Sequence, residues 1–150
     1  MCIRDRVSTL ESMAYNFLST DCIVCAVMDA RCSQVYNALF EIKNGVVTRL
    51  CDDRALSLDD LKNELLSVDG RIIIAGDGTD ITCKYIGNEI KNAESAPVNL
   101  KYQRASSTAL VAFEIINNGK TVSAQELMPV YLRLPQAQRE LNKKLGGRTK

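Results

Sequence analysis

The strongest candidate for ligand chemistry in this sequence is Gly76-Asp77-Gly78. It lies between an expected buried strand, Arg71 to Ala75, and an expected helix from Asp80 to about Lys91. At such a junction, backbone amides and the helix dipole can hold a phosphate, and glycine permits its close approach. Gly76, Asp77 and Gly78 are therefore candidate cofactor-binding residues. A tight turn that uses glycine for its backbone freedom is the alternative, and for so short a motif we favour it.

Catalytic side chains are harder to find, because the chain contains no histidine. This excludes the commonest general base and the Ser-His and Cys-His nucleophile pairs. Asp29 and Arg31 follow a strand end, where they could polarise a ligand or pair with each other and nearby backbone, which we favour. A catalytic scheme would rest on carboxylates such as Asp29 and Asp77, and the sequence gives no sign that these converge. We assign no catalytic residue and no metal ligand.

The six cysteines follow no disulfide framework spacing, and we expect reduced thiols. Cys22-Ile-Val-Cys25 has the CxxC form that can bind metal, but it lies within an expected strand. Residues three apart in a strand point to opposite faces of the sheet. The pair therefore cannot chelate one metal ion.

Helices and strands alternate in the expected order of elements, with an early hairpin. Capping boxes or caps at Ser8 and Ser57 begin two amphipathic helices, and Asn44-Gly45 joins two strands of the hairpin. The expected elements are a helix from Ser8, strands at 22–28, 34–42, 46–50 and 71–75, helices from Ser57, at 80–91 and at 106–117 closed by Asn118-Gly119, and a loop over 93–103. Ser123 with Glu126 predicts a further short turn. This pattern predicts an α/β fold, a mixed β-sheet with helices packed against it, as one lobe of a larger architecture.

Composition and charge indicate one compact domain. The chain has 150 residues, 46% hydrophobic and 25% charged, and no apolar run is long enough to span a bilayer. We expect a soluble, cytoplasmic protein. The tail from Arg133 to Lys150 carries six basic residues and one acidic residue, a net charge of +5. We favour a solubilising terminus over an RNA-contacting arm. Met1 to Arg6 fits no element, and we expect a non-native leader at 1–6.

Several motifs, taken in order, resemble the TsaB (YeaZ-type) family. They are Val7-Ser8-Thr9-Leu10-Glu11, Met28-Asp29-Ala30-Arg31, Val35-Tyr36, Gly76-Asp77-Gly78, Ala105-Ser106-Ser107 and Pro129-Val130-Tyr131-Leu132-Arg133. The resemblance runs from Val7 to about Arg139, and its weight lies in order and spacing. It implies an actin-like, ribonuclease-H-like lobe over 7–133, followed by a basic tail over 134–150.

The resemblance also implies a function without chemistry of its own. TsaB-type proteins are non-catalytic partners of the TsaD catalytic subunit, and with the ATPase TsaE the pair supports threonylcarbamoylation of the tRNA adenosine beside the anticodon. No cofactor is expected on this chain, while ATP or ADP is a candidate at the level of the complex. The tRNA would be an indirect partner, and a homodimer is a further alternative. No membrane partner is expected.

Two enzyme classes remain as alternatives. One is a nucleotide-dependent enzyme of the actin-like superfamily that uses Gly76 to Gly78 against phosphate. The other is a glycoprotease-type peptidase, against which the missing histidines argue, since the related catalytic subunit holds its metal through histidine. A self-associating structural module is the third reading.

The match covers only the C-terminal portion of the family pattern, so we expect a fragment that lacks the family's N-terminal lobe. An exposed apolar patch and marginal solubility are expected where that lobe would pack. Tyr131 and Arg133 are residue types that anchor interfaces. Completion of the core by Tyr131 and Leu132 is the equal alternative.

Overall fold

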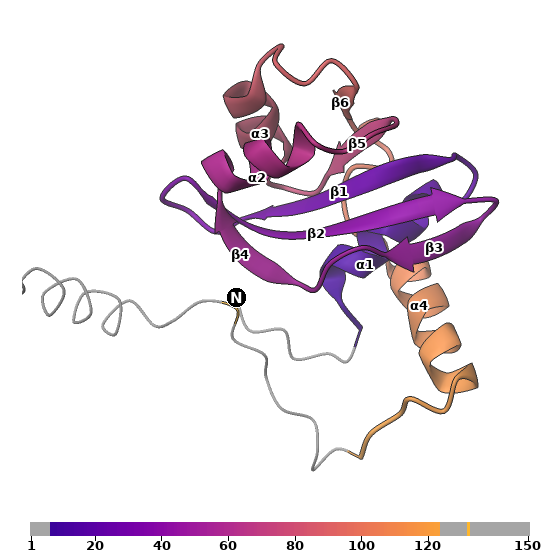
Figure 1. Ribbon diagram of the computed structural model, residues 1–150. Helices are drawn as coiled ribbons and strands as arrows, with labels where there is room; N and C mark the ends of the chain where they lie inside the picture. The colour runs from indigo at the N-terminus through magenta and orange to yellow at the C-terminus, as the bar shows by residue number, and fades with distance from the viewer. Residues whose placement is uncertain (1–6, 124–131, 133–150) are drawn as a thin grey trace, which may run out of the picture.

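The computed structural model describes residues 7–123 and Leu132. These residues form a six-stranded sheet in the order β3-β2-β1-β5-β6, with β4 also paired to β2. The elements are α1 (Thr9–Ala14), η1 (Tyr15–Phe17), β1 (Cys22–Asp29), β2 (Gln34–Lys43), β3 (Val46–Arg49), β4 (Arg54–Ser57), α2 (Leu58–Leu65), β5 (Ile72–Ala75), α3 (Thr79–Ile86), β6 (Ala93–Ser95) and α4 (Ala105–Asn117). Figure 1 shows this arrangement, and it confirms the expected mixed sheet with packed helices.

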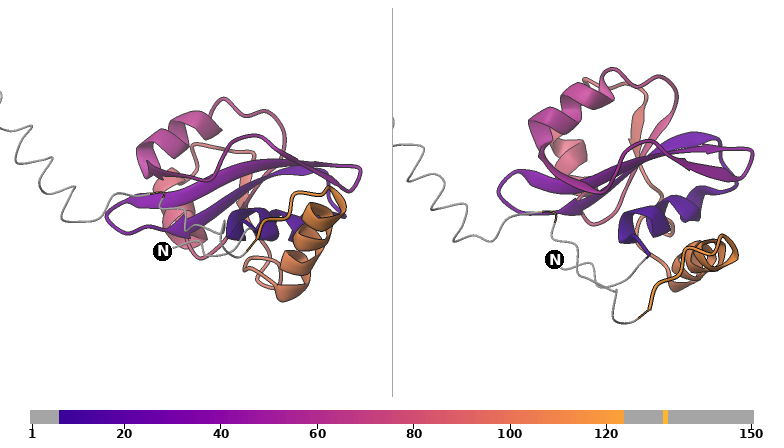
Figure 2. Two further views of the ribbon diagram at one scale, coloured as in Figure 1. Left: turned by 90° about the horizontal axis from the view of Figure 1, so that it is seen from below. Right: turned by 60° about the horizontal axis from the view of Figure 1, so that its bottom comes forward.

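Two helical layers cover the two faces of the sheet. In Figure 2, α1 and α4 lie on one side and α2 and α3 on the other. Helix α1 buries Leu10 and Met13 against one face, and α2 buries Leu61 and Leu65 against the opposite face. Helix α4 packs on α1 and η1, farther from the strands. It is therefore an outer element of its layer.

Strand β1 lies at the centre because its side chains are apolar on both faces. It pairs antiparallel with β2 and parallel with β5, and alternate residues enter the two core clusters. Cys22 joins the cluster on the α1 side, while Cys25 joins the cluster on the α2 side. The prediction that these two thiols point to opposite faces is confirmed. Among the described residues, Cys22, Cys25, Cys32, Cys51 and Cys83 are all free thiols, as expected.

Local turn and cap signals are also confirmed. Asn44 and Gly45 adopt φ values of 51° and 75°, which reverse the chain between β2 and β3. Ser57 caps α2 by accepting a hydrogen bond from the Asp60 amide at 3.1 Å. Helix α4 ends where the Gly119 and Lys120 amides donate to earlier carbonyls, in the paired pattern of a Schellman cap.

Two expectations about elements are wrong, and one strand was missed. The helix expected from Asp80 to about Lys91 spans Thr79–Ile86, because Gly87 takes a φ of 58° and ends it. The region expected as a loop over 93–103 contains β6, which pairs parallel with β5. Strand β4 was not expected, and it pairs with β2. Both missed strands are short, at four residues or fewer, and depend on a distant partner strand more than on their own pattern.

Some expectations lie outside the described residues. They are the leader at Met1 to Arg6, the capping partner Glu126, the Pro129-to-Arg133 motif apart from Leu132, and the basic tail over 134–150. Within the part of the chain that the structure describes, no helix is long and apolar enough to cross a membrane.

Candidate functional site

The turn at Gly76 lies where β5 ends, against the backbone of β1. Gly76 has a φ of 118°, and a Cβ atom there would lie 1.9 Å from the Val27 carbonyl oxygen. Its amide donates to the Lys101 carbonyl at 2.7 Å. Only glycine fits this position without moving the backbone. The glycine is therefore explained by close packing of the turn on β1.

Two further amides at this turn, those of Gly78 and Thr79, also donate within the protein. Gly78 donates to the Val27 carbonyl, and Thr79 donates to the Gly76 carbonyl, each at 3.2 Å. The Thr79 hydroxyl reinforces the turn by donating to the Gly76 carbonyl at 2.7 Å. An amide that already donates to a carbonyl has little left to offer a phosphate. This geometry supports the tight-turn alternative, and cofactor contact by Gly76, Asp77 and Gly78 stays a prediction.

Asp29 and Asp77 come together at the carboxyl edge of the sheet, a convergence that no sequence pattern indicated. The Asp29 amide donates to Asp77 Oδ1 at 3.1 Å, and the Arg31 amide donates to Asp29 Oδ1 at 2.7 Å. The convergence follows from the parallel pairing of β1 with β5, which brings their ends to one edge. Both carboxylates accept backbone hydrogen bonds, so the expected pairing of Asp29 with neighbouring backbone is confirmed. Arg31 contacts Asp29 through its backbone amide, and pairing of the two side chains stays a prediction.

Lys101 is a residue near this edge that the sequence did not single out. Its side chain is largely buried, and its Nζ lies 2.6 Å from Asp80 Oδ1 in the first turn of α3. The hydrogen bond from Lys101 to Asp80 raises the pKa of the Lys101 ammonium group, and this effect outweighs burial, which lowers it. Because Asp80 partners the ammonium group, the cation beside the Gly76 turn is already neutralised. Because no motif surrounds Lys101, the sequence does not predict that it pairs with Asp80.

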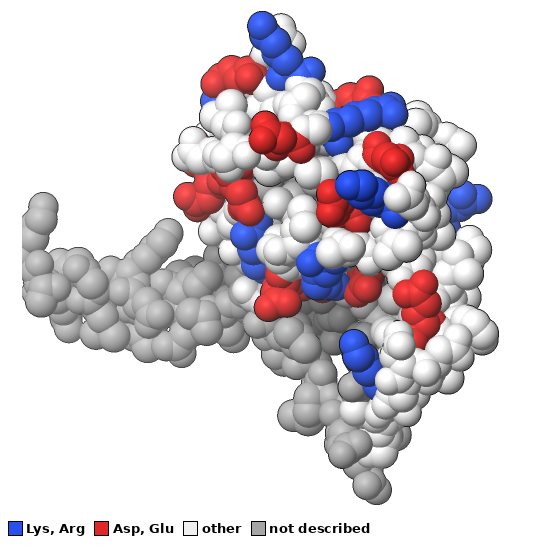
Figure 3. All heavy atoms as spheres, turned by 45° about the vertical axis from the view of Figure 1, so that its right-hand side comes forward, with Lys and Arg blue, Asp and Glu red and all other residues white. Residues whose placement is uncertain are grey.

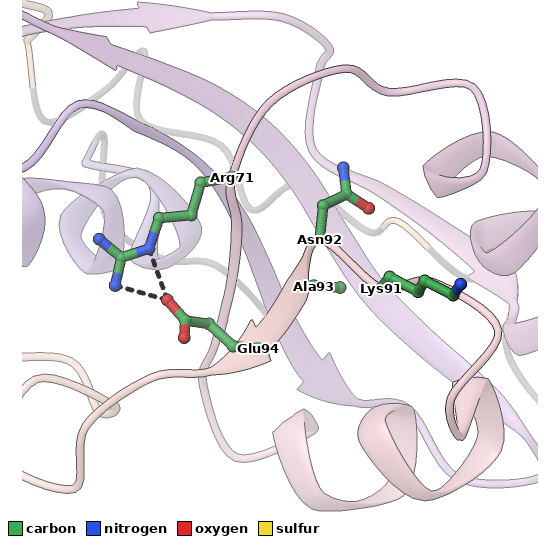
Figure 4. Close-up of a pocket in the computed structure, with 5 residues that line it drawn as sticks. All are labelled: Arg71, Lys91, Asn92, Ala93 and Glu94. Atoms are coloured by element: carbon green, nitrogen blue, oxygen red, sulfur yellow. Dashed lines mark hydrogen bonds and ion pairs between the residues drawn. The ribbon is translucent and has the colours of Figure 1, made fainter.

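A hollow of about 320 Å³ lies at the opposite end of β5 and β6. Figure 4 shows its lining residues, with Arg71 and Glu94 joined as an ion pair at 2.5 Å. Asn92 donates to the Gly70 carbonyl at 2.6 Å, so it holds the preceding loop. Ligands of parallel sheets bind at the carboxyl ends of strands, and this hollow lies at the amino ends. We do not assign it as a binding site.

Among the described helices, α4 has the large apolar side chains with the highest exposed fractions. Leu110, Phe113 and Ile116 are 48%, 63% and 59% exposed. With their exposed neighbours they form a row along the helix that we name the outer stripe: Ser106, Ala109, Leu110, Phe113, Ile116 and Asn117. Figure 3 shows a mostly uncharged surface at the lower right of that view. The outer stripe is an exposed apolar patch, and its expected position, where an N-terminal lobe would pack, stays a prediction.

The inner face of α4 is held largely by polar contacts. The Ser107 hydroxyl donates to Asn16 Oδ1 at 2.6 Å, and the Tyr15 hydroxyl donates to the Glu114 carboxylate. Burial, followed by this hydrogen bond, raises the pKa of Tyr15 above its ordinary value. Val111 supplies the main buried apolar contact of the helix. Helix α4 thus carries large apolar side chains on its exposed side as well as on the side that faces the protein, whereas the usual helix keeps its exposed side polar.

No candidate metal site was found in residues 7–123 and Leu132. No group of three or more acidic or cysteine side chains in these residues is arranged to hold an ion. Two features therefore stand out among the described residues. One is the Gly76 turn at the carboxyl edge of the sheet, where most amides donate to protein carbonyls. The other is the exposed, uncharged side of α4.

Known proteins were compared with the chain by sequence and by structure. No family model matches the sequence. The tRNA threonylcarbamoyladenosine biosynthesis protein TsaB of Bacillus subtilis is 27% identical over 133 residues, which cover 88% of this chain and 56% of that protein.

Two solved structures from Pseudomonas aeruginosa share the fold. YeaZ matches with a TM-score of 0.63 at 19% identity, covering 84% of this chain and 57% of that one. An uncharacterized protein with similarity to peptidase YeaZ matches with a TM-score of 0.63 at 20% identity, covering 85% and 57%. The chain thus spans just over half the length of the relatives that it matches. The sequence similarity to TsaB over most of this chain agrees with the resemblance that its motifs indicated, and the two YeaZ-type structures share its fold.

Proposed function

We propose that this chain takes part in the biosynthesis of threonylcarbamoyladenosine in tRNA, as an accessory subunit without chemistry of its own. The observation that carries the proposal is the match to B. subtilis TsaB over 88% of the chain. The YeaZ-type fold of the described residues supports it. In this proposal the chain partners a TsaD-type catalytic subunit, acts with a TsaE-type ATPase, and meets tRNA only through the complex.

Two features of the chain favour an accessory role over an enzymatic one. The sequence has no histidine, so a metal site of the kind held by histidine in the related catalytic subunit cannot form. At the carboxyl edge, the amides of Gly76, Gly78 and Thr79 donate to protein carbonyls. Both features argue against chemistry carried out by this chain and so favour the accessory role. A cytoplasmic location, and ATP or ADP bound only within the complex, belong to the same proposal.

A peptidase is the second candidate, because one structural relative is described by its similarity to peptidase YeaZ. Peptide hydrolysis needs an activated nucleophile or a metal-bound water. With no histidine, Asp29 and Asp77 would have to serve, and both carboxylates accept backbone hydrogen bonds. We therefore rank the accessory role first.

A chimera tests the proposed function. The portion of B. subtilis TsaB that this chain matches is replaced by residues 7–139 of this chain, and the chimera is expressed in B. subtilis depleted of its own TsaB. We expect the chimera to co-purify with the TsaD-type subunit and to maintain threonylcarbamoyladenosine in tRNA, measured by mass spectrometry of tRNA nucleosides. This chain alone is assayed in parallel.

The controls make either outcome informative. Circular dichroism and a cooperative thermal transition establish that the chimera is folded, and immunoblotting establishes its level. A folded chimera at normal level that neither binds the TsaD-type subunit nor maintains the modification would overturn the proposal. Hydrolysis of a peptide library by the purified chain, lost in an Asp29→Asn and Asp77→Asn variant, would move the peptidase candidate forward.

A further inference from the structure

We propose that Asn44 is a site of spontaneous covalent modification, at which its side chain cyclises onto the backbone nitrogen of Gly45 and is converted to aspartate and isoaspartate. The inference uses the geometry of the β2–β3 turn and does not depend on the proposed function. The sequence contains two Asn-Gly pairs, Asn44-Gly45 and Asn118-Gly119. The local geometry of the two pairs differs, and this difference assigns the reaction to the first pair.

The reaction needs only water as a co-reactant. The Gly45 nitrogen attacks the side-chain carbonyl carbon of Asn44, so a carbon–nitrogen bond forms and closes a succinimide ring. The bond from that carbon to the side-chain nitrogen breaks, and ammonia leaves with the proton of the Gly45 amide. Water then opens the ring at either carbonyl carbon, which gives aspartate or isoaspartate. Because glycine has no side chain, nothing on Gly45 shields its nitrogen from this reaction.

The reacting groups of the first pair are free. Asn44 and Gly45 are both exposed, and among the described residues neither the Asn44 side chain nor the Gly45 amide has a hydrogen-bond partner. The flanking positions are held, because the Asn44 amide donates to Asp21 Oδ1 at 2.9 Å and Val46 pairs with Lys43. The peptide between Asn44 and Gly45 is therefore the part of the turn that can rotate.

Rotation of this central peptide brings the turn to the geometry of cyclisation. The φ values of 51° at Asn44 and 75° at Gly45 have the signs of a type I′ turn. Turning the central peptide over gives a type II′ turn, in which the first central residue keeps its positive φ and takes a ψ of about −120°. At that ψ the glycine nitrogen eclipses the asparagine Cβ, as it does in the succinimide ring. Both turn types join paired strands, so the hairpin need not open for the reaction.

The second pair is held in a geometry that opposes the reaction. Asn118 follows α4 with a φ of −84°, and the Gly119 amide donates to the Ile116 carbonyl at 3.0 Å. Rotation of the peptide between Asn118 and Gly119 turns the attacking nitrogen away from Ile116 and breaks this bond of the helix cap. The loss of one backbone hydrogen bond should slow cyclisation at Asn118 about fivefold relative to Asn44.

Conversion to isoaspartate should weaken the edge of the sheet. Isoaspartate adds a carbon to the backbone, and a two-residue turn fixes the register of the strands that it joins. Strand β3 ends at Arg49, which lies 2.7 Å from Glu11 of α1 and 2.6 Å from Asp53. A shifted β3 therefore also loosens the ion pairs that hold the start of α1.

Peptide mapping of the full 150-residue chain tests the assignment. The folded protein is incubated at mildly alkaline pH in heavy-oxygen water, and mass spectrometry follows the conversion and the heavy oxygen gained on ring opening. Isoaspartate is measured by methyl transfer from S-adenosylmethionine with a protein isoaspartyl methyltransferase. Asn44 should convert at least about fivefold faster than Asn118. In guanidinium chloride the two pairs should convert at similar rates, because no fold distinguishes them.

Asn44→Gly is the matched control, because Gly-Gly also suits a type I′ turn and offers no side-chain amide. This variant should keep the circular dichroism spectrum of the wild type and lose the methylation at position 44. Hydroxylamine cleaves a chain at a succinimide, so it should cut the folded wild type between Asn44 and Gly45 and leave the variant intact there.

Two results would overturn the assignment. One is a folded wild type in which Asn44 does not convert, and the other is conversion of Asn118 at least as fast as that of Asn44. The isoaspartyl form, separated by ion exchange, should unfold at a lower temperature than Asn44→Gly. Equal unfolding temperatures would contradict the predicted shift of β3.

Discussion

Helices α2 and α4 use their apolar residues in opposite ways. In α2, Leu58, Leu61 and Leu65 are buried against the sheet, while Asp59 and Asp60 face outward near the positive end of the helix. In α4, Leu110, Phe113 and Ile116 face outward. The buried Val111 and polar contacts to α1 and η1 hold the inner face. Helix α2 therefore completes the core of this chain, whereas α4 leaves large apolar side chains exposed.

The N-terminal caps of α2 and α4 also differ. Ser57 caps α2 through its side chain, whereas Arg104, at the corresponding position of α4, makes no side-chain cap hydrogen bond. Helix α4 therefore lacks the side-chain cap that stabilises the start of α2. The contrast shows that an apolar helix need not bury its large apolar side chains in the core of its own chain.

Leucine truncation in the two helices should give the largest difference. Leu61 is fully buried, and we expect Leu61→Ala to lower the free energy of unfolding by about 2–5 kcal/mol. Leu110 is half exposed, so Leu110→Ala in dilute protein should cost less than about 1 kcal/mol. Urea unfolding followed by circular dichroism measures both. Equal losses at the two positions would break the contrast between α2 and α4.

Exchange of the two caps should give smaller effects of opposite sign. Ser57→Ala removes a capping oxygen, and we expect a loss of about 1 kcal/mol. Arg104 already has extended backbone angles, φ −127° and ψ 138°, so Arg104→Ser should add a cap and stabilise by about 0.5–1 kcal/mol. The same urea experiment serves for both. A destabilising Arg104→Ser would mean that Arg104 contributes to the monomer in a way that its cap geometry does not show.

The polar anchor of α4 should appear as a dependence on alkaline pH. Burial and the hydrogen bond with Glu114 raise the pKa of Tyr15 in the folded state, while the unfolded value is near 10. The stability that this gives is present below about pH 10 and is lost as pH rises from there toward the folded-state pKa. Tyr15→Phe removes this dependence.

Buried thiols make the comparison with Tyr15→Phe necessary. Burial raises the pKa of Cys25 as well, so stability already falls above the ordinary thiol pKa near 8.5. The Tyr15 contribution is therefore the difference between wild type and Tyr15→Phe, measured by thermal unfolding from pH 8 to about pH 11. Identical pH profiles would show that Tyr15 does not anchor α4.

The sequence predicted those parts of the fold that local chemistry decides. The two-faced apolar run of β1, the Asn44-Gly45 turn and the Ser57 cap each contain their own signal within a few residues. Strands β4 and β6 lack such a signal, because pairing with β2 and β5 determines them. Length and periodicity alone therefore missed both strands.

The candidate site was less predictable, since it depends on residues far apart in the chain. Asp29 meets Asp77 through strand pairing, and Lys101 reaches Asp80 from a loop with no motif. The periodicity of α4 predicted a helix correctly, but periodicity does not say which side faces the core. The polar contacts from Tyr15 and Asn16 decide that, and only the assembled fold shows them.

Hydrogen exchange of α2 and α4 tests the central contrast most directly. We expect the α4 amides to exchange faster than those of α2, because α2 buries three leucines against the sheet whereas α4 buries Ser107 and Val111. Equal exchange in the two helices, or faster exchange in α2, would contradict the account.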